Sequence, residues 1–576
     1  MMNKKYLLLL TILIFAAFLR FYQLGNNPPS LTWDEAAWGY NAYSIGIDGR
    51  DEFGRFLPLD YLESFGDFKP PVYAYLDVLP VKIFGLSELA VRFPSALFGA
   101  LTVLLTYFLV KALFKTNSKS DPSASLRARI INPKQIQNTK YKILNTEAIA
   151  LLSAFFLAIS PWHIMLSRAA FEANVATFFI VLGVLLFFAG IQKRGWLLLL
   201  SVVSFVLSIY TFNTARIVTP ILVLILAFAF RKKLLERKRE TLFAIFLGII
   251  LILPTVKFLV SPQASLRFKE VNIFSDIGVI RNTNQEIAND SNAVWSKVIH
   301  NRRFAYAVSY LNHYFDNLSI DFLFIKGDGN PKFSTQTVGE MFLWDLPFFI
   351  AGILFLIRKR EGLWWIIPIW LIVGIIPAAT ARETPHALRI ETVLPTFQIL
   401  TAYGFYHFIS GLKTYDLRLK NFLKGKLFIT ISFISYVLLL INFLYFYHDY
   451  LVHYKRIYSG EWQYGYKESI NYVSSVYGNY DQINITTELG RPYIYYLFYT
   501  KTPPGEFKKT AKVEREVFGF VNVKGYGKYR FLKDLKDVSN KKVLYVNSAQ
   551  NTPNNAKILK TFYLLNGDPV LKAYTL

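Results

Sequence analysis

Apolar runs about as long as a membrane-spanning helix recur along most of the chain, separated by short polar segments. A helix needs roughly 20 apolar residues to cross about 30 Å of hydrocarbon. The pattern predicts about eleven spans, at residues 6–19, 87–114, 147–165, 172–191, 196–213, 216–230, 241–260, 339–357, 363–380, 388–409 and 427–446. We therefore expect an all-α polytopic membrane domain over residues 1–446.

The first apolar run follows two basic residues, Lys4 and Lys5. A signal peptide has the same order, a charged start and then an apolar core. No small-residue cleavage site precedes Arg20, so an uncleaved first helix is the favoured interpretation. Ser160 and Pro161 interrupt the third span, and only a short connection, residues 211–216, separates the fifth span from the sixth.

Basic residues gather in the segments between the apolar runs and produce a formal net charge of +25. Short cytoplasmic loops are rich in Lys and Arg. With the N-terminus in the cytoplasm, every basic cluster falls on that side: 115–142, which we expect to be a flexible loop, 193–194, 231–239, 358–360 and 411–426. Residues 25–86, 160–172, 261–338, 381–387 and the tail then lie outside. We expect a multi-pass plasma membrane protein, and this topology explains the charge without a nucleic-acid partner.

The tail, residues 447–576, lacks apolar runs and contains short strand-like stretches, such as 482–487 and 542–546. It predicts a small extracytoplasmic α/β domain. The chain has no cysteine, which excludes disulfides, thiolate nucleophiles and Cys-ligated zinc.

Two adjacent carboxylates, Asp34 and Glu35, open the first outside segment. Charges at the membrane boundary are costly without a task or a partner. One of them is a candidate general base, which would take a proton from an attacking hydroxyl or amine. The alternative is a helix cap, because Thr32 and Glu35 have the spacing of a capping box.

Two cations follow in the same part of the chain. Lys69, before Pro70 and Pro71, is a candidate phosphate ligand, and an interfacial anchor among tyrosines is the alternative. Arg92 at the start of the second span is expected to pair with an outside carboxylate or to extend to the interface.

Two outside corners also carry charge. In the corner 160–172, Arg168 and Glu172 form either a second acidic site for a metal or the acceptor, or an ion pair four residues apart. In the corner 380–389, Arg382 and Arg389 either clamp a phosphate or extend to the interface.

The order of these motifs resembles the bacterial branch of the protein-O-mannosyltransferase and aminoarabinose-transferase superfamily, which is family 39-like and of the GT-C class. The resemblance covers about residues 1–410 and rests on five segments: Asp34-Glu35-Ala36, Lys69-Pro70-Pro71, Glu88 to Gly99, Ser167 to Glu172 and Pro385 to Arg389. It implies the GT-C fold and transfer of a hexose or pentose from a polyprenyl-phosphate donor to an acceptor on the outer face, usually with inversion.

By this resemblance Asp34 is the catalytic base and Glu35 its neighbour. Four residues match positions near the donor phosphate, and two match a second acidic site. The first set is Lys69, Arg92, His386 and Arg389, and the second is Glu172 with Arg168. The expected partners are the lipid-linked sugar donor, membrane lipids, and a protein, lipid or glycan acceptor. A divalent metal is compatible with the pattern but not required by it.

Two other classes of protein fit the many spans. A transporter or lipid flippase would also place charges among apolar helices, but the chain shows no paired broken helices in two related halves. A non-catalytic scaffold would use the tail for recognition, with the outside carboxylates as helix caps.

Overall fold

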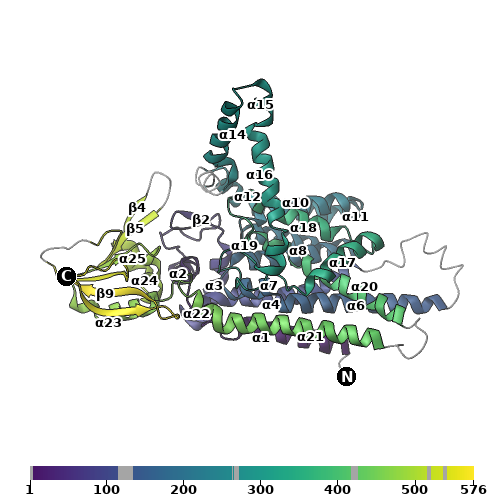
Figure 1. Ribbon diagram of the computed structural model, residues 1–576, viewed down its shortest axis with the longest axis horizontal. Helices are drawn as coiled ribbons and strands as arrows, with labels where there is room; N and C mark the ends of the chain where they lie inside the picture. The colour runs from purple at the N-terminus through teal and green to yellow at the C-terminus, as the bar shows by residue number, and fades with distance from the viewer. Residues whose placement is uncertain are drawn as a thin grey trace.

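The computed structural model describes residues 4–114, 134–261, 264, 272–416, 426–515, 521–535 and 541–576, with side chains described for these residues except 134–145 and 414–416. The chain forms a bundle of long helices with a sheet-containing domain at one end (Figure 1). This domain holds the C-terminus, and the N-terminus lies at the other end of the bundle. Most of the predicted loops 115–142 and 411–426 falls outside the described residues, although residues 134–142 begin a helix.

A helix occupies the place of every predicted span. The helices are α1 (Lys4–Phe21), α4 (Glu88–Leu113), α6 (Lys134–Ile159) with α7 (Pro161–Arg168), α8 (Glu172–Gln192), α9 (Leu197–Ile209), α10 (Ala215–Ala229), α12 (Lys238–Leu259), α17 (Asp345–Lys359), α18 (Ile366–Ala379), α20 (Thr396–Asp416) and α21 (Lys426–Asp449). The last helix continues through η4 (Tyr450–Tyr454) into α22 (Lys455–Ile457).

Among the described residues, four helices are long and apolar enough to cross a membrane, or five if the bent pair of α6 and α7 is one span. The helices α9, α10 and α18 are apolar but shorter. The chain is therefore a multi-pass membrane protein, and the count of eleven spans stays a prediction.

The interruption at Ser160 and Pro161 is a bend between α6 and α7. The helix bends by 55° there. Ser160 caps α7 by accepting a hydrogen bond from the backbone N–H of His163, and Pro161, which has no N–H, takes the first helical position. Ala169 is extended, so the chain leaves the helical path before α8 begins.

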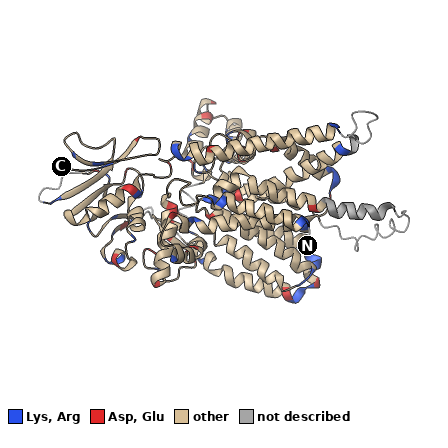
Figure 2. Ribbon diagram, turned by 90° about the horizontal axis from the view of Figure 1, so that it is seen from below, with Lys and Arg blue, Asp and Glu red and all other residues tan. Residues whose placement is uncertain are grey.

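Basic residues gather at the end of the bundle that holds the N-terminus (Figure 2). The short basic helix α11 (Arg231–Glu236) lies at this end, away from the C-terminal domain. The structure thus places the basic segment 231–239, predicted to be cytoplasmic, and the C-terminal domain, predicted to be extracytoplasmic, at opposite ends of the bundle. Which side of the membrane each end faces stays a prediction.

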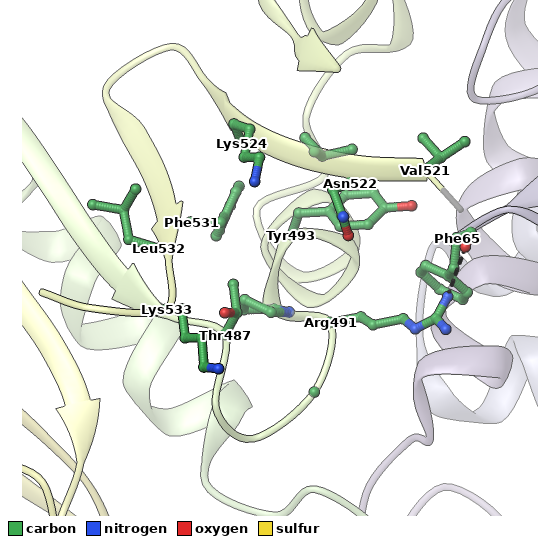
Figure 3. Close-up of a pocket in the computed structure, with 13 residues that line it drawn as sticks. Phe65, Thr487, Arg491, Tyr493, Val521, Asn522, Lys524, Phe531, Leu532 and Lys533 are labelled. Atoms are coloured by element: carbon green, nitrogen blue, oxygen red, sulfur yellow. Dashed lines mark hydrogen bonds between the residues drawn. The ribbon is translucent and has the colours of Figure 1, made fainter. Parts of the chain in front are cut away.

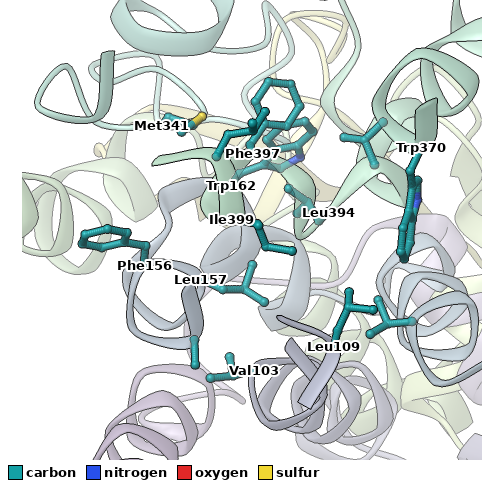
Figure 4. Packing of buried hydrophobic residues seen from close by; sticks show 14 of the residues in the cluster. Val103, Leu109, Phe156, Leu157, Trp162, Met341, Trp370, Leu394, Phe397 and Ile399 are labelled. Carbon is teal, nitrogen blue, oxygen red and sulfur yellow. The ribbon is translucent and has the colours of Figure 1, made fainter. Parts of the chain in front are cut away.

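The bundle core is close-packed. Apolar side chains from α4, α6, α7, α18 and α20 interleave within it, among them Val103, Leu157, Trp162, Trp370 and Phe397 (Figure 4). Helices α17 and α20 approach so closely that a Cβ on Gly352 would lie 2.0 Å from the carbonyl oxygen of Leu400. Small residues permit such approach between membrane helices. The close packing of α17 on α20 therefore requires glycine at position 352.

The first outside segment contains α2 (Trp33–Asp48), the strands β1 (Leu62–Ser64) and β2 (Asp67–Lys69), and α3 (Val72–Phe84). The two strands pair antiparallel, with Leu62 opposite Lys69. Phe65 and Gly66 both have positive φ, as a tight two-residue hairpin turn requires. The hairpin thereby brings Lys69 back beside the start of α2.

The 261–338 loop and the corner after α18 contain short helices. They are η1 (Ile273–Ser275), α14 (Ile277–Asn289), α15 (Val294–Ile299), α16 (Arg302–Asp316), η2 (Asp321–Ile325), α19 (Ala387–Ile390) and η3 (Glu391–Val393). The helices α14 to α16 form an arm that stands away from the bundle (Figure 1).

The C-terminal domain has a seven-stranded sheet in the order β4-β5-β6-β3-β7-β9-β8. Its elements are α23 (Tyr466–Ser475), η5 (Tyr477–Asn479), β3 (Gln482–Thr486), α24 (Pro492–Tyr499), α25 (Pro504–Thr510), β4 (Lys512–Arg515), β5 (Val521–Tyr526), β6 (Tyr529–Leu532), β7 (Val543–Ser548), β8 (Lys557–Tyr563) and β9 (Pro569–Thr575). The two stretches predicted to be strands are β3 and β7. The strand β3 is parallel to both β6 and β7.

Helix α24 attaches this domain to the first outside segment. The hydroxyl of Tyr493 donates to Glu52 at 2.9 Å, and that of Tyr495 donates to the carbonyl of Leu31 at 3.2 Å. One hydrophobic cluster includes side chains from α2, α3 and α24. The domain is therefore packed firmly beside the residues that precede Asp34.

Candidate active site

Asp34 and Glu35 lie in the first turn of α2 but have opposite environments. Thr32 and Glu35 form the predicted capping box, in which each side chain bonds the backbone N–H of the other residue. Glu35 is fully buried, whereas half of the Asp34 side chain is exposed. Successive residues of a helix are rotated by about 100° around its axis, so the two side chains point in different directions. The Glu35 carboxylate supports the fold, and the Asp34 carboxylate is accessible.

Lys69 forms an ion pair with Asp34. Its side chain is almost entirely buried, and its ammonium group lies 5.0 Å from the ring centre of Trp38. The hairpin turn between β1 and β2 sets this position, because it reverses the chain just before Lys69. The structure therefore brings together two of the predicted site residues.

Two further cations act on Asp34 from distant parts of the chain. They are Arg491, which precedes α24, and Lys332, which lies 5.3 Å from the ring centre of Trp33. Burial raises the pKa of Asp34, but the charge and hydrogen bond of Lys69 and the charges of Arg491 and Lys332 outweigh it and place the pKa below its ordinary value. Asp34 is thus ionised at neutral pH.

Arg92 pairs with Glu35, as one of its two predicted interpretations requires. Its Nε lies 2.8 Å from Glu35 Oε1, and the guanidinium also donates to the carbonyls of Leu24, Pro28 and Ser30. The Arg92 side chain is fully buried. Glu35 in turn accepts from the backbone N–H of Ala170 at 3.0 Å. This pair ties α2, α4 and the 160–172 corner together.

Arg168 does not form the predicted pair with Glu172 among its described contacts. Its two terminal nitrogens donate to backbone carbonyls, those of Leu19, Arg20, Tyr22 and Asn27. Its Nε donates to the hydroxyl of Tyr450. This alternative is not realised, because Ala169 is extended and breaks the helical spacing between the two residues. Arg168 instead organises the chain that leaves α1.

Glu172 begins α8 near the ion pair. The charges of Lys69 and Asp34 both act on its carboxylate. Glu391, which the sequence analysis did not single out, is fully buried, and its charge interacts with that of Glu172. Glu391 lies next to an apolar stretch of the sequence. An acidic residue at the edge of a predicted span is a candidate functional residue, and this signal could have identified Glu391.

His386 and Arg389 lie in a corner with its own contacts. His386 is largely buried, caps α19 by accepting from the backbone N–H of Arg389, and packs 4.9 Å from the ring of Phe333. Burial lowers the pKa of His386 to about 3. Arg389 donates to the carbonyl of Glu383 at 2.9 Å. The other arginine of this corner, Arg382, donates to the carbonyl of Asn272.

Asp328 supports this corner from the outer loop. Its carboxylate accepts from the backbone N–H of Ala387 at 2.7 Å and lies 3.8 Å from Nδ1 of His386. Burial raises the pKa of Asp328 to about 6. The structure therefore groups His386 and Arg389 with Asp328.

Sequence reasoning missed Arg491 and Lys332, because neither belongs to a motif. No group of three His, Asp or Glu side chains placed to hold a metal occurs within the described part of the chain. The arrangement at Asp34 combines an accessible, ionised carboxylate with a buried lysine and two further cations. It suits proton removal beside a bound anion.

Comparisons with known proteins bear on one segment of the sequence and on the fold. The family model described as "Dolichyl-phosphate-mannose-protein mannosyltransferase" matches residues 68–120, a segment that contains Lys69 and Arg92. The match is limited to this segment, and it agrees with the resemblance to family 39-like glycosyltransferases that the sequence predicted.

Two solved structures of ArnT from Cupriavidus metallidurans share the fold. The apo structure has a TM-score of 0.50 at 12% sequence identity and covers 99% of this chain and 97% of that one. The structure bound to undecaprenyl phosphate has a TM-score of 0.51 at 12% identity, with 98% and 97% covered.

A protein from Aquifex aeolicus (strain VF5), named "Uncharacterized protein", is 31% identical over 223 residues. The match covers 38% of this chain and 36% of the relative, so the chain matches only about a third of that protein's length.

Proposed function

We propose that the protein transfers a monosaccharide, a hexose or a pentose, from a polyprenyl-phosphate donor to an acceptor on the extracytoplasmic face of the membrane. The observation that carries this proposal is the accessible Asp34 carboxylate paired with the buried Lys69. The GT-C fold supports it, and one of the ArnT structures with this fold holds undecaprenyl phosphate.

Asp34 acts as the general base. It takes the proton of the acceptor hydroxyl or amine while the acceptor atom forms a bond to the anomeric carbon. The bond from that carbon to the phosphate oxygen breaks, and polyprenyl phosphate leaves with the electron pair. A single in-line displacement inverts the anomeric configuration, so no covalent enzyme intermediate forms.

Lys69 stabilises the charge that develops on the leaving phosphate. A preformed cation in a water-poor site contributes most where charge develops in the transition state. Before the donor binds, Lys69 holds Asp34 and keeps its pKa low. The phosphate then competes for Lys69, so the proton affinity of Asp34 rises as the reaction begins.

Arg92 acts as a positioning residue. Its guanidinium is fully buried and bound to Glu35 and three carbonyls, so it holds the first turn of α2 in place. Glu172 lies close enough to Lys69 and Asp34 to orient the acceptor.

The test is donor consumption by the purified protein with a panel of polyprenyl-phosphate sugars. Replacing a general base lowers turnover by about 100-fold or more, and we expect this for Asp34→Asn. Asp48→Asn is the matched control, because Asp48 ends the same helix and pairs with Lys508 on the surface. Consumption of no donor by the wild type, or full activity of Asp34→Asn, would contradict the proposal.

A further inference from the structure

A cavity of about 510 Å³ lies where the C-terminal domain meets the first outside segment. Its wall comes from β5, from the end of β6, from the chain between β3 and α24, and from Phe65 in the hairpin turn (Figure 3). The volume falls within the range of ordinary ligand sites. None of its lining residues is among the candidate site residues of the sequence analysis.

The cavity lies at the carboxyl ends of two parallel strands. Thr487 directly follows β3, Lys533 directly follows β6, and both line the cavity. The two strands pair in parallel, with Thr486 opposite Leu532. Crevices beyond the carboxyl ends of parallel strands are the usual ligand sites of α/β sheets.

The lining combines aromatic rings with cations. Phe65, Tyr493 and Phe531 supply rings, and Arg491, Lys524 and Lys533 are arranged around them (Figure 3). Rings pack well against the apolar faces of sugar rings, whereas ammonium and guanidinium groups bind carboxylates and phosphates. The combination fits a saccharide that carries negative charge.

The cations have contacts that a ligand is able to supplement or replace. Lys524 is half exposed and pairs with the exposed Glu514 at 3.0 Å, a surface pair of little energetic weight. Arg491 donates one hydrogen bond, at 3.1 Å, to the carbonyl of Phe65 and lies 4.5 Å from its ring centre. This contact leaves further N–H donors of the guanidinium for an anion.

The cavity adjoins the candidate active site. Gly490 lines it, and a Cβ at this position would lie 3.1 Å from the ring of Trp33, the residue before Asp34. The positive φ of Gly490 also favours glycine. Arg491 lines the cavity and acts on the charge of Asp34. The cavity therefore lies beside the segment that carries Asp34.

We propose that this cavity is the acceptor subsite and that it binds a saccharide bearing carboxylate or phosphate groups. The assignment to the acceptor rests on the proposed function. The lipid-linked donor must stay with the apolar helices, which form a bundle apart from the C-terminal domain (Figure 1). The cavity, in contrast, is lined by that domain and the hairpin turn. The acceptor and the donor thus reach Asp34 from opposite sides.

The experiment measures equilibrium binding to the full-length protein in detergent, without donor. The probes are α-1,4-linked trigalacturonic acid, maltotriose as its neutral match, and maltotriose carrying a phosphate monoester. We expect at least one anionic probe to bind about tenfold or more tightly than maltotriose. Which of the two binds more tightly identifies the carboxylate or the phosphate as the preferred group.

The double variant Lys524→Gln/Lys533→Gln is expected to weaken binding of the anionic probe about tenfold and to leave maltotriose binding unchanged. Lys557→Gln is the matched control. Lys557 begins β8, an edge strand of the same sheet that lies away from the cavity-lining strands β5 and β6. Equal binding of anionic and neutral probes, or full anion binding by the double variant, would overturn the proposal.

Comparing anion-selective binding with donor consumption by the wild type separates the two proposals. Anion-selective binding by a wild-type protein that consumes no donor would sink the proposed function, and with it the acceptor role, but leave the cavity as a site for anionic saccharides. Donor consumption without anion-selective binding would do the reverse.

Discussion

The corner at Asp34 and the corner at His386 both carry charges at the outer ends of helices, but they use these charges differently. At Asp34 an accessible carboxylate meets cations from the hairpin, the outer loop and the C-terminal domain. At His386 the imidazole caps its own helix, and Arg389 bonds a carbonyl six residues away. Chemistry requires groups that a substrate is able to reach, and only the first corner exposes its central group.

The largest effect is expected from removing the support behind Asp34. Arg92→Leu leaves the Glu35 carboxylate buried without its cation, which costs about 3–5 kcal/mol. Thermal unfolding in detergent measures this loss. Arg55→Leu is the control, because the Arg55–Asp60 pair is partly exposed. Equal destabilisation by both variants would show that the buried pair does not hold the first turn of α2.

Lys69→Gln is expected to lower turnover about 100-fold, since it removes a preformed charge beside the leaving phosphate. It also removes the largest effect that lowers the pKa of Asp34, so that pKa rises. Because the ionised form is the base, the acid limb of the pH–rate profile moves to higher pH. The exposed Lys82→Gln on α3 is the control. A profile with an unshifted acid limb would separate Lys69 from Asp34 in function.

His386→Ala removes a helix cap, which costs about 1 kcal/mol, and is expected to leave the shape of the pH–rate profile unchanged. The pKa of His386 is lowered to about 3 from an ordinary 6.5, so the unfolded chain binds a proton that the folded chain does not. The wild type therefore loses stability as pH falls below about 6.5, and the variant should lose less. Unfolding curves at several pH values measure this, and identical slopes would contradict it.

Arg389→Gln should have the smallest effect. The Arg389 side chain is a quarter exposed, and Glu383, whose carboxylate lies 3.8 Å away, is mostly exposed, so the pair contributes about 0–1 kcal/mol. We expect turnover and the KM for the donor to change by less than about fivefold. A large rise in that KM would instead place the donor phosphate at this corner.

The apolar runs predicted where the helices lie, because burial and membrane contact act on each segment by itself. The capping box, one of the two interpretations of this segment, and the interruption at Ser160 and Pro161 are also local features, and the structure contains both. The partner of Arg92 was restricted to the outside carboxylates, and the structure identifies Glu35.

Other contacts were not readable from local pattern. Arg491 reaches Asp34 only because α24 packs on α2, and this packing joins residues more than 450 positions apart. Arg168 and Glu172 have the spacing of a helical pair, but the extended backbone at Ala169 separates them. His386 was interpreted as a phosphate contact from its place in a motif, and this role stays a prediction. The structure shows its imidazole accepting from the backbone N–H of Arg389 and lying 3.8 Å from the Asp328 carboxylate.

The central claim is that Asp34 removes the proton of the acceptor. Asp34→Ala with azide tests it most directly, because azide attacks the anomeric carbon without losing a proton. The account predicts that this variant fails with a hydroxyl acceptor but forms a glycosyl azide of inverted configuration from the polyprenyl-phosphate donor. Full activity with the hydroxyl acceptor, or failure to form the azide while the donor still binds, would contradict the account.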